Sequence, residues 1–268
     1  MSMKSLEGKN VWITGASSGI GLELSLLAAS AGAKLHLFSS RKEALADASR
    51  LSVEKGALSV QYSIVDLSDS DAAMSVSRDA LETGGVPDFL ILNAGVSQRA
   101  LAADTGMDVT RGILDLNFFG SVAVARTVLP EMIEKGGGHI AVTSSVTGVF
   151  GFPMRSAYAA SKHALHGYFE SVGLEYASEG IKVTLIIPGR IRTPISINSL
   201  TADGSRHGKM DPGQEKGMNV TLCAEKYWKA VLRGKNEAVI GGFDTIMVFF
   251  HRYFPRIFRF IARRASPL

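Results

Sequence analysis

Short apolar segments alternate with helix-forming segments along most of the chain. The apolar segments are rich in β-branched residues, and we predict a buried strand at KNVWIT (residues 9–14) and further strands at KLHLF (34–38), SVQYSI (59–64), DFLIL (88–92), HIAVT (139–143), KVTLII (182–187) and EAVI (237–240). Helical patterns between them predict helices, for example at residues 69–82, 104–135, 157–178 and 223–233. Strands that alternate with helices form right-handed βαβ units. The pattern therefore predicts an α/β fold with a doubly wound, seven-stranded parallel sheet and helices on both faces.

The sequence predicts one domain over residues 1–244 and a separate tail over residues 245–268. A chain of 268 residues that is 46% apolar suits one large core. The one long irregular segment, residues 190–217, follows the KVTLII strand and therefore lies at the carboxyl edge of the sheet, where ligands bind in such folds. We predict that this segment is a substrate loop.

The chain shows no pattern typical of secretion or of a membrane span. Its first residues, MSMKSLEGKN, contain no apolar signal region, and no run of about 18 apolar residues is found. The single cysteine, Cys223, excludes an intrachain disulfide and fits a reducing compartment. These features predict a cytoplasmic protein.

The formal net charge of +4 has a local origin, because residues 245–268 hold five arginines and no acidic residue. A nucleic-acid-binding protein usually carries a broad basic face. We therefore expect no nucleic-acid partner. Since no cluster of His, Cys and Asp has metal-ligand spacing, we predict no metal site.

A glycine-rich segment, TGASSGIG, follows the first strand and begins a helix. Its Gly-x3-Gly-x-Gly spacing lets the backbone turn sharply and approach a pyrophosphate, which the free N–H groups of the helix then bind. Alone, such a segment is also typical of an ordinary turn; its place between a strand and a helix favours a dinucleotide site. The predicted cofactor-binding residues here are Gly15, Ser17, Ser18, Gly19, Ile20 and Gly21.

The second strand ends in Ser39, Ser40 and Arg41. In NAD sites a carboxylate at this point binds the ribose 2′-hydroxyl. Here an arginine and two hydroxyls stand instead, which suits a 2′-phosphate. We predict that NADP(H) is preferred and leave NAD(H) as the alternative, in which Arg41 is simply a solvated residue at the start of a helix.

SAYAASK places Tyr158 and Lys162 four residues apart, on one face of a helix. A nearby ammonium lowers the pKa of a phenol, and a phenol tuned in this way can protonate a carbonyl oxygen. A surface Tyr–Lys pair is the alternative. Ser144 and Ser145 end the fifth strand, and a hydroxyl there is placed to hold the substrate oxygen.

Several motifs occur together in one order: TGASSGIG, NAG (residues 93–95), Asn117, Ser145, YAASK (158–162) and PGRIRT (188–193). With them the chain resembles the classical short-chain dehydrogenases/reductases (SDRs) over about residues 8–242. Within that family it resembles most the member 7B group, through RSAYAASKHAL and TADGSRHGKMD. The resemblance implies a Rossmann-type fold and an oxidoreductase.

The resemblance also implies roles for the catalytic residues. Ser145 would hydrogen-bond the substrate oxygen, and Tyr158 would act as general acid in reduction and as general base in oxidation. Lys162 would tune Tyr158 and bind the nicotinamide ribose. Asn117 would hold a water that relays protons to Lys162.

For the cofactor, the resemblance implies that Thr193 meets the nicotinamide carboxamide and that Asp66 meets the adenine. Asn93 would stabilise the central sheet beside the cofactor, and Pro188 and Gly189 would complete the site. NADP-type members often place a basic residue directly after the position of Ser39. This chain departs from them, since its arginine comes one residue later.

The resulting hypothesis is an NADP(H)-dependent oxidoreductase that interconverts a ketone or aldehyde and an alcohol. Apolar residues of the substrate loop, together with the resemblance, favour a hydrophobic or lipid-like substrate. A catalytically silent NADP(H)-binding regulatory protein is the alternative. Family members are commonly dimers or tetramers, so we expect a homodimer or homotetramer formed through the helices at 104–135 and 157–178. Three arginines, Arg155, Arg190 and Arg192, are candidates to pair with a substrate phosphate; ordinary surface charge is the alternative.

The tail lies beyond the resemblance. Four arginines recur at spacings of four, three and four, which places Arg252, Arg256, Arg259 and Arg263 on one helical face, with Phe250, Phe254, Ile257, Phe258 and Ile261 largely away from it. Pro255 should kink or divide the helix. Two interpretations stay open: a helix that lies peripherally in a membrane interface, or a helix whose apolar face covers the substrate pocket or a partner subunit.

Overall fold

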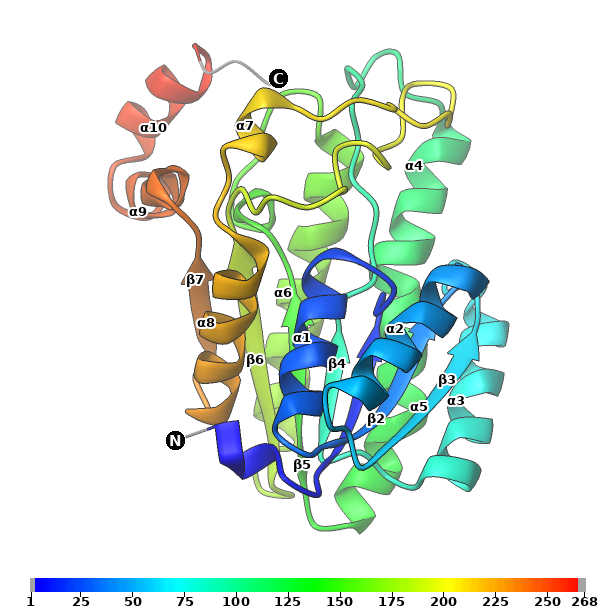
Figure 1. The fold of residues 1–268 in the computed structure, drawn as a ribbon. Coiled ribbons are helices and arrows are strands. Elements are labelled where there is room, and N and C mark those ends of the chain that lie inside the picture. Colours follow the sequence, from blue (N-terminus) through cyan, green and yellow to red (C-terminus); the bar gives the residue numbers. More distant parts are fainter. Residues whose placement is uncertain (1–2, 265–268) are drawn as a thin grey trace.

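The computed structural model describes residues 3–264, and these form a seven-stranded parallel sheet with helices on both faces (Figure 1). The strand order is β3-β2-β1-β4-β5-β6-β7. The strands are β1 (Asn10–Thr14), β2 (Lys34–Ser39), β3 (Ser59–Ile64), β4 (Phe89–Leu92), β5 (Gly138–Thr143), β6 (Ile181–Pro188) and β7 (Glu237–Ile240). The predicted Rossmann-type fold is confirmed.

Helices α1 (Gly19–Ser30), α2 (Lys42–Glu54) and α8 (Val220–Leu232) cover one face of the sheet. Helices α3 (Ser70–Gly84), α5 (Gly120–Glu134) and α6 (Ser156–Glu175) cover the other. The remaining helices are α4 (Met107–Leu114), α7 (Pro212–Glu215), α9 (Ile246–Tyr253) and α10 (Pro255–Ala262), with short 3-10 turns at Met3–Leu6, Val146–Gly148 and Phe243–Thr245.

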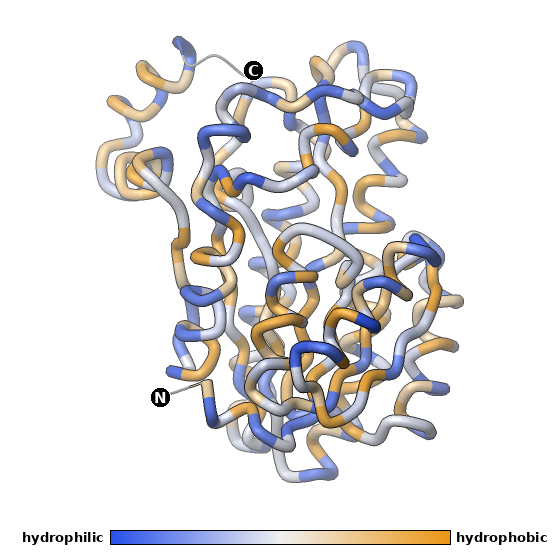
Figure 2. The backbone as a smooth tube through the Cα atoms, in the orientation of Figure 1, coloured by the Kyte–Doolittle hydropathy of each residue, from blue (hydrophilic) through white to orange (hydrophobic). Residues whose placement is uncertain are grey.

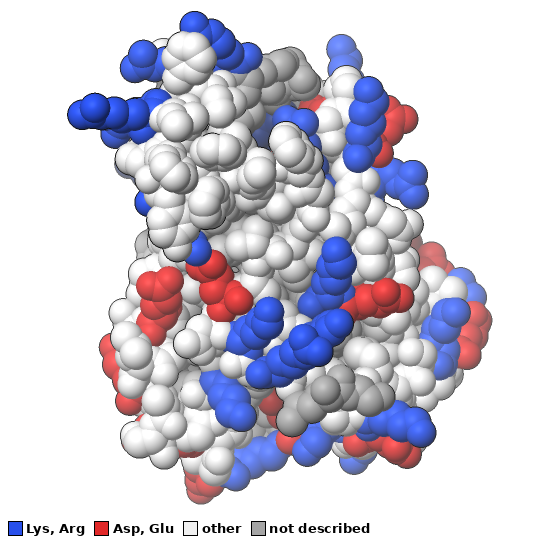
Figure 3. Space-filling model, turned by 90° about the vertical axis from the view of Figure 1, so that its left-hand side faces the viewer, with Lys and Arg blue, Asp and Glu red and all other residues white. Residues whose placement is uncertain are grey.

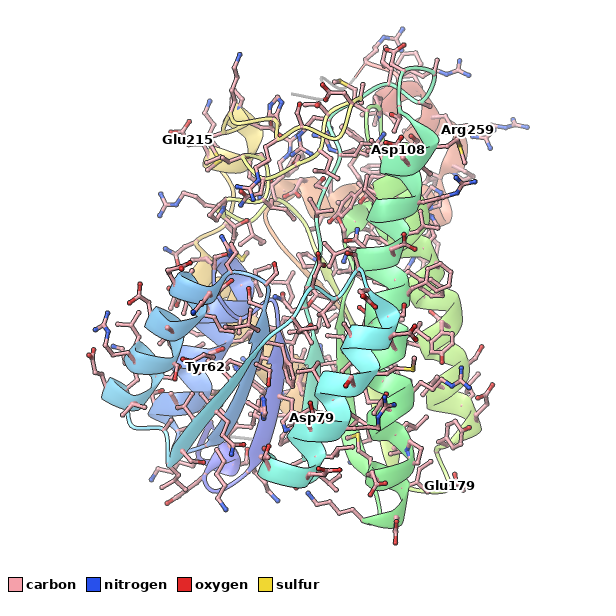
Figure 4. All side chains as sticks on the ribbon, turned by 90° about the vertical axis from the view of Figure 1, so that its right-hand side faces the viewer. Tyr62, Asp79, Asp108, Glu179, Glu215 and Arg259 are labelled. Atoms are coloured by element: carbon pink, nitrogen blue, oxygen red, sulfur yellow. The ribbon has the colours of Figure 1, made fainter. Side chains whose placement is uncertain are left out.

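Two apolar layers bury the sheet. On the first face Leu24 of α1 packs against Trp228 of α8, whose Nε1 donates to the Leu24 carbonyl at 3.1 Å. On the second face Val124 of α5 and Phe169 of α6 are completely buried. β3 forms one edge of the sheet, so its Tyr62, labelled in Figure 4, stays exposed. Burial of both faces of the central strands explains their continuous apolar runs.

The order of the strands reverses between β1 and β4. From β1 the chain proceeds outward to β2 and β3, and from β4 it proceeds in the other direction to β7. At such a reversal the connections after the two central strands lead to opposite faces, which leaves a crevice at their carboxyl ends. The glycine-rich turn after β1 and the NAG motif after β4 lie at this point of the fold.

The helix expected over residues 104–135 is interrupted by a π-helical turn, Asp115–Phe119, between α4 and α5. Gly120 follows this turn and allows close packing, because a Cβ there would lie 2.2 Å from the Leu67 carbonyl oxygen. By length and composition alone, the whole stretch Met107–Glu134 is apolar enough to cross a membrane, which differs from our expectation. Core packing accounts for part of that apolar character, because Val124, Val128 and Met132 of α5 are buried in the second layer and 44% of the apolar window is buried.

The tail forms two short helices, α9 and α10, that meet at Phe254. Pro255 occupies the first turn of α10, where its missing N–H is not needed, so the predicted division is confirmed. The two helices lie beside β7 at the carboxyl end of the sheet (Figure 1). The end of the predicted tail, residues 265–268, lies outside the described residues.

Two buried histidines predict a stability that falls in mild acid. Burial lowers the pKa of His36 and of His139 to about 4. Their Nε2 atoms contact the hydroxyls of Ser63 and Thr184 at 2.8 Å, and Nδ1 of His36 has no hydrogen-bond partner within residues 3–264. The unfolded chain binds protons at these rings below a pH of 6.5, and the folded chain does so only near pH 4. The free energy of unfolding should therefore decrease as the pH falls through that window.

At about pH 5 we expect a loss of roughly 2 kcal/mol for each of the two rings, relative to about pH 7.5. Denaturant unfolding at both pH values measures the loss. The double variant His36→Gln/His139→Gln should lack most of it. A loss of equal size in the wild type and the double variant would contradict the assignment.

Candidate active site

One cleft of about 1090 Å³ runs along the carboxyl ends of the strands, from the glycine-rich turn to the predicted substrate loop and the tail. Most of the residues predicted for the site line it: Gly15, Ser17, Ser18, Gly19, Ile20, Ser39, Ser40, Arg41, Asp66, Asn93, Ser145, Tyr158, Lys162, Pro188, Gly189 and Thr193. Gly21 and Asn117 are not among the lining residues and lie in the surrounding structure.

The glycine-rich turn forms one end of the cleft. Gly15 and Gly19 have φ values of 65° and 56°, in the left-handed region that favours glycine. Gly21 serves packing instead, because a Cβ there would lie 2.3 Å from the Gly15 carbonyl oxygen. The N-cap residue of α1, Ser18, makes no side-chain capping hydrogen bond, so the N–H groups of the first turn remain for an anion.

Arg41 extends back over this turn. Its Nε and one terminal nitrogen donate to the Ser17 hydroxyl at 3.2 and 2.9 Å, and that terminal nitrogen also donates to the Ser18 hydroxyl. The Ser17 hydroxyl is 2.7 Å from that of Ser39. One guanidinium and three hydroxyls therefore converge beside the helix terminus, although the arginine comes one residue later than in many NADP-type members. Ser40 is exposed at the edge of this group.

Tyr158 and Lys162 project from α6 toward the other part of the cleft. Both are buried, and Lys162 Nζ lies 5.9 Å from the centre of the Tyr158 ring. Lys162 Nζ donates to the Thr143 carbonyl at the end of β5, at 2.7 Å. The two serines after β5 differ: Ser144 contacts His166 at 2.8 Å within the α6 layer, and Ser145 hydrogen-bonds Tyr158. The structure thus places Ser145, Tyr158 and Lys162 together.

The expected lowering of the Tyr158 pKa is not found. Burial is the largest effect and raises the pKa of Tyr158 above its usual value, against the lowering effects of the Ser145 hydrogen bond and of Arg99 and Arg155. Burial also lowers the pKa of Lys162 to about 8. Lys162 is not among the groups that shift the phenol. At pH 7 the phenol is therefore protonated, as a proton donor must be.

Asn117 lies behind the cleft wall, in the π-helical turn. Its side chain accepts from the Val96 N–H at 2.8 Å and donates to the Val96 carbonyl and to Ser161, both at 2.9 Å. Gly95 separates it from Lys162, since a Cβ there would lie 3.0 Å from Asn117 Oδ1 and 3.3 Å from Lys162 Nζ. With its side chain occupied in this way, Asn117 holds the segment after β4 against α6. A water relay through Asn117 stays a prediction.

The other predicted cofactor residues surround the cleft. Asn93 binds the central sheet, with its Nδ2 donating to the carbonyls of Thr14 and Gly15 at 3.2 and 3.4 Å. Asp66 accepts from the backbone and hydroxyl of Ser68. After β6, the Arg190 N–H donates to Asp244 at 2.7 Å, which joins the start of the predicted substrate loop to the residue just before the tail.

At the end of the cleft that holds Tyr158, the sequence indicated Arg155 but not its charged neighbours Arg99 and Asp211. Arg99 and Asp211 form a buried ion pair, with Arg99 Nε 2.7 Å from Asp211 Oδ2. Arg155 reaches the same oxygen at 3.5 Å, and His207 lies 3.4 Å from the other oxygen. Burial, followed by the charge of Arg99, lowers the pKa of Arg155 to about 9. Two guanidiniums thus meet one carboxylate beside Tyr158.

Two backbone contacts hold this group in place. The Arg99 N–H donates to the Leu200 carbonyl at 2.8 Å, and the Leu200 N–H donates to the Ser97 carbonyl at 2.9 Å. The sequence analysis also did not identify Gln98, which is completely buried. Its side-chain oxygen accepts from the Ala157 N–H at 2.8 Å and so caps the start of α6. No local pattern marks these residues, because their partners lie about 60 to 110 positions away.

Of the three arginines predicted to meet a substrate phosphate, Arg155 and Arg190 line the cleft. Arg192 is exposed and does not line it. The two stretches that carry the resemblance to the member 7B group meet here, because Arg155 belongs to the first and Asp211 to the second.

The sheet is doubly wound and parallel, and its carboxyl edge carries a glycine-rich turn and a tyrosine with a lysine beside it. This combination defines a nucleotide-binding α/β protein of the dehydrogenase type. A family model described as short chain dehydrogenase matches residues 9–203. The chain belongs to the short-chain dehydrogenase/reductase family.

Known proteins support this membership. The rat dehydrogenase/reductase SDR family member 7B is 37% identical over 262 residues, covering 95% of this chain and 81% of the relative. A short-chain dehydrogenase structure from Streptomyces avermitilis has a TM-score of 0.81 and 26% identity, covering 97% of this chain and all of that one. A Burkholderia phymatum family member in complex with NAD also has a TM-score of 0.81, at 23% identity, with 98% of both chains covered. The resemblance to the member 7B group is confirmed.

Proposed function

We propose that the protein is an NADP(H)-dependent oxidoreductase that interconverts a ketone or aldehyde and an alcohol. The proposal rests on one observation: a single cleft has a different set of polar and charged side chains at each of its two ends. One end has the Arg41 guanidinium and the open terminus of α1, and the other has Ser145, Tyr158 and Lys162. Such a cleft suits a dinucleotide phosphate at the first end and a reacting carbonyl at the second.

The residues present fit the cofactor. The first turn of α1 would bind the pyrophosphate, Arg41 with Ser17 and Ser18 the 2′-phosphate, and Lys162 the nicotinamide ribose. Asp66 would meet the adenine and Thr193 the carboxamide. When bound, the nicotinamide supplies or accepts the hydride.

Ser145 and Tyr158 handle the proton and the substrate oxygen. The Ser145 hydroxyl holds the carbonyl oxygen by a hydrogen bond. Because burial keeps Tyr158 protonated, the phenol donates its proton to that oxygen in reduction. In the oxidation direction Tyr158 must first lose its proton and become a phenolate. Alkaline pH therefore favours oxidation. The nearby guanidiniums of Arg99 and Arg155 oppose the burial effect and assist phenolate formation.

A substrate screen tests the proposal. We expect NADPH oxidation with at least some members of a panel of hydrophobic ketones and aldehydes, followed by absorbance, and slower oxidation of NADH. Binding of NADPH without turnover of any carbonyl would favour the silent regulatory alternative. The presence of Asn117, Ser145, Tyr158 and Lys162 together favours the enzyme, because a silent member should have lost part of this set.

The substrate end of the cleft is partly apolar and partly cationic. Apolar side chains there include Phe150, Phe152, Ile195, Leu200 and Met247. They support a hydrophobic or lipid-like substrate, and the guanidiniums of Arg155 and Arg190 in the cleft lining support one that also carries an anionic group such as a phosphate.

We predict that Arg155→Gln lowers kcat/KM for a phosphate-bearing ketone roughly ten- to a hundredfold, because a charge-assisted hydrogen bond is lost. The kcat/KM for a neutral ketone of equal chain length should change much less. Arg192→Gln, which alters an exposed arginine outside the cleft lining, is the matched control. Equal effects of Arg155→Gln on both substrates would show that Arg155 does not recognise the negative charge of the substrate phosphate.

We also propose a homodimer or homotetramer formed through α4, α5 and α6. Phe119 before α5 and Leu174 in α6 are large apolar side chains that remain exposed on these elements. Burial against a second copy would remove them from water.

We further propose a cytoplasmic protein that associates peripherally with membranes.

A further inference from the structure

The two tail helices expose an unusual amount of apolar surface. On α9, Ile246, Phe249 and Tyr253 share one exposed face, since they are three and four positions apart. The ring of Phe249 lies 4.9 Å from Tyr253 and 5.9 Å from Phe254, which continues the surface to α10. We call this set the tail surface: Phe243, Ile246, Phe249, Tyr253, Phe254, Ile257, Phe260 and Ile261, all exposed.

Arginines border the tail surface. Arg256, Arg259, Arg263 and Arg264 line a shallow groove on α10 around Phe260, and the Arg264 guanidinium lies 3.7 Å from the Phe260 ring centre. Figure 3 shows basic side chains beside a broad uncharged area at the upper left, and in Figure 4 Arg259 points away from the body of the protein. Hydrophobic and hydrophilic residues alternate along α10 in Figure 2. Residues 245–268 contain no acidic residue to neutralise this charge.

One predicted arginine does not belong to this border. Because the helix breaks at Phe254, Arg252 of α9 turns toward β7 and pairs with Glu237 at 2.6 Å. The prediction of one face with four arginines is therefore wrong for Arg252. Its ion pair instead joins α9 to β7, the edge strand of the sheet.

The tail is attached firmly to the cleft. Val248 and Phe258 are buried in an apolar cluster with Phe150, whose ring centre lies 4.9 Å from that of Phe258. One of the two interpretations of the tail was that it packs within the molecule. Its inner side, with Val248 and Phe258, packs in this way. Phe243, Met247 and Ile261 line the cleft as well, so the tail surface is continuous with the cleft entrance.

We propose that the tail surface docks on an anionic lipid bilayer. The exposed aromatic and aliphatic side chains enter the interfacial region, and the arginines around Phe260 pair with lipid phosphates or carboxylates. In this orientation the cleft entrance faces the membrane surface. A lipid-like substrate then reaches Tyr158 without crossing bulk water. This consequence rests on the proposed function, whereas the docking itself is independent of that function.

Charge favours a bilayer over a second copy of the chain. A twofold contact places the same surface on both partners. Here it would bring the arginines of two α10 helices together, with no acidic residue of the tail between them. Anionic headgroups remove that repulsion, and each arginine near such a surface contributes to binding.

Flotation of the full-length protein with vesicles tests the docking. We expect flotation with phosphatidylcholine vesicles that contain phosphatidylserine, and little with phosphatidylcholine alone or at high salt. Arg256→Gln/Arg259→Gln/Arg263→Gln should weaken partitioning about a hundredfold. Phe249→Ser/Phe254→Ser should abolish most of it. Val53→Ser/Leu58→Ser, which alters two exposed apolar residues elsewhere, should leave it unchanged.

Absence of flotation at low salt, or flotation that persists in both tail variants, would overturn the proposal. A tail variant that changes the oligomeric state in light scattering but not its vesicle binding would assign the surface to a second copy. Turnover of a short, water-soluble ketone should be equal in the wild type and the tail variants. Loss of flotation with retained turnover thus separates the docking from the proposed chemistry.

Discussion

Tyr158→Phe should lose nearly all turnover while it still binds NADPH. The change removes the phenol proton and keeps the ring, which is buried beside Ser145 and Lys162. General acid–base catalysis contributes roughly a hundred- to ten-thousandfold to a rate, and the loss of kcat should fall in that range. Steady-state kinetics and a fluorescence titration with NADPH measure the two effects separately.

Tyr168→Phe is the matched control, since it removes a hydroxyl from the same helix ten residues further on. Its kcat should equal that of the wild type. In the oxidation direction the wild-type rate should rise with pH, because burial raises the pKa of Tyr158, and the residual rate of Tyr158→Phe should lack this rise. A Tyr158→Phe enzyme with near-normal kcat would end the assignment.

Arg41→Ala should weaken the use of NADPH and spare that of NADH. The Arg41 guanidinium converges with the hydroxyls of Ser17 and Ser18 beside the terminus of α1, where a 2′-phosphate would lie. A hydrogen bond to a charged group contributes about 1.5 to 3 kcal/mol, so KM for NADPH should rise roughly ten- to a hundredfold. Kinetics with both cofactors give the ratio.

Lys42→Ala removes the neighbouring cation and serves as the control, with an unchanged cofactor ratio expected. Equal kcat/KM for NADPH and NADH in the wild type would show that the 2′-phosphate is not recognised. In that case the Arg41 network would serve only to hold the glycine-rich turn.

The sheet could be predicted because most strands have a continuous apolar run with its own boundary, whereas the edge strand β3, SVQYSI, alternates polar and apolar residues. The seven observed strands agree with the predicted ones to within about one residue at each end. The residues of the glycine-rich turn and of α6 could be placed for a similar reason, since motif spacing within one helix or turn is a local property. The π-helical turn at Asn117 has no such signal, because it depends on packing between α4, α5 and α6.

The electrostatics of the site could not be predicted in the same way. The Tyr–Lys spacing suggested a lowered phenol pKa, but the sequence does not show that Tyr158 is buried, and burial decides the direction. The partner of Arg99 lies 112 residues away, and that of Arg252 lies on β7. Contacts between distant segments decided these details, whereas the motifs carried only local information.

The buried pair between Arg99 and Asp211 has a consequence for protein engineering. The predicted substrate loop is tied through Leu200 and Asp211 to the segment after β4, so it does not behave as an independent module. A loop graft that carried residues 190–217 into a related scaffold would bring a buried carboxylate without its cation, and such unpaired charges are strongly destabilising. The transferable unit is the loop together with residues 97–99 and Arg155, and recombination of family members should keep these segments from the same parent.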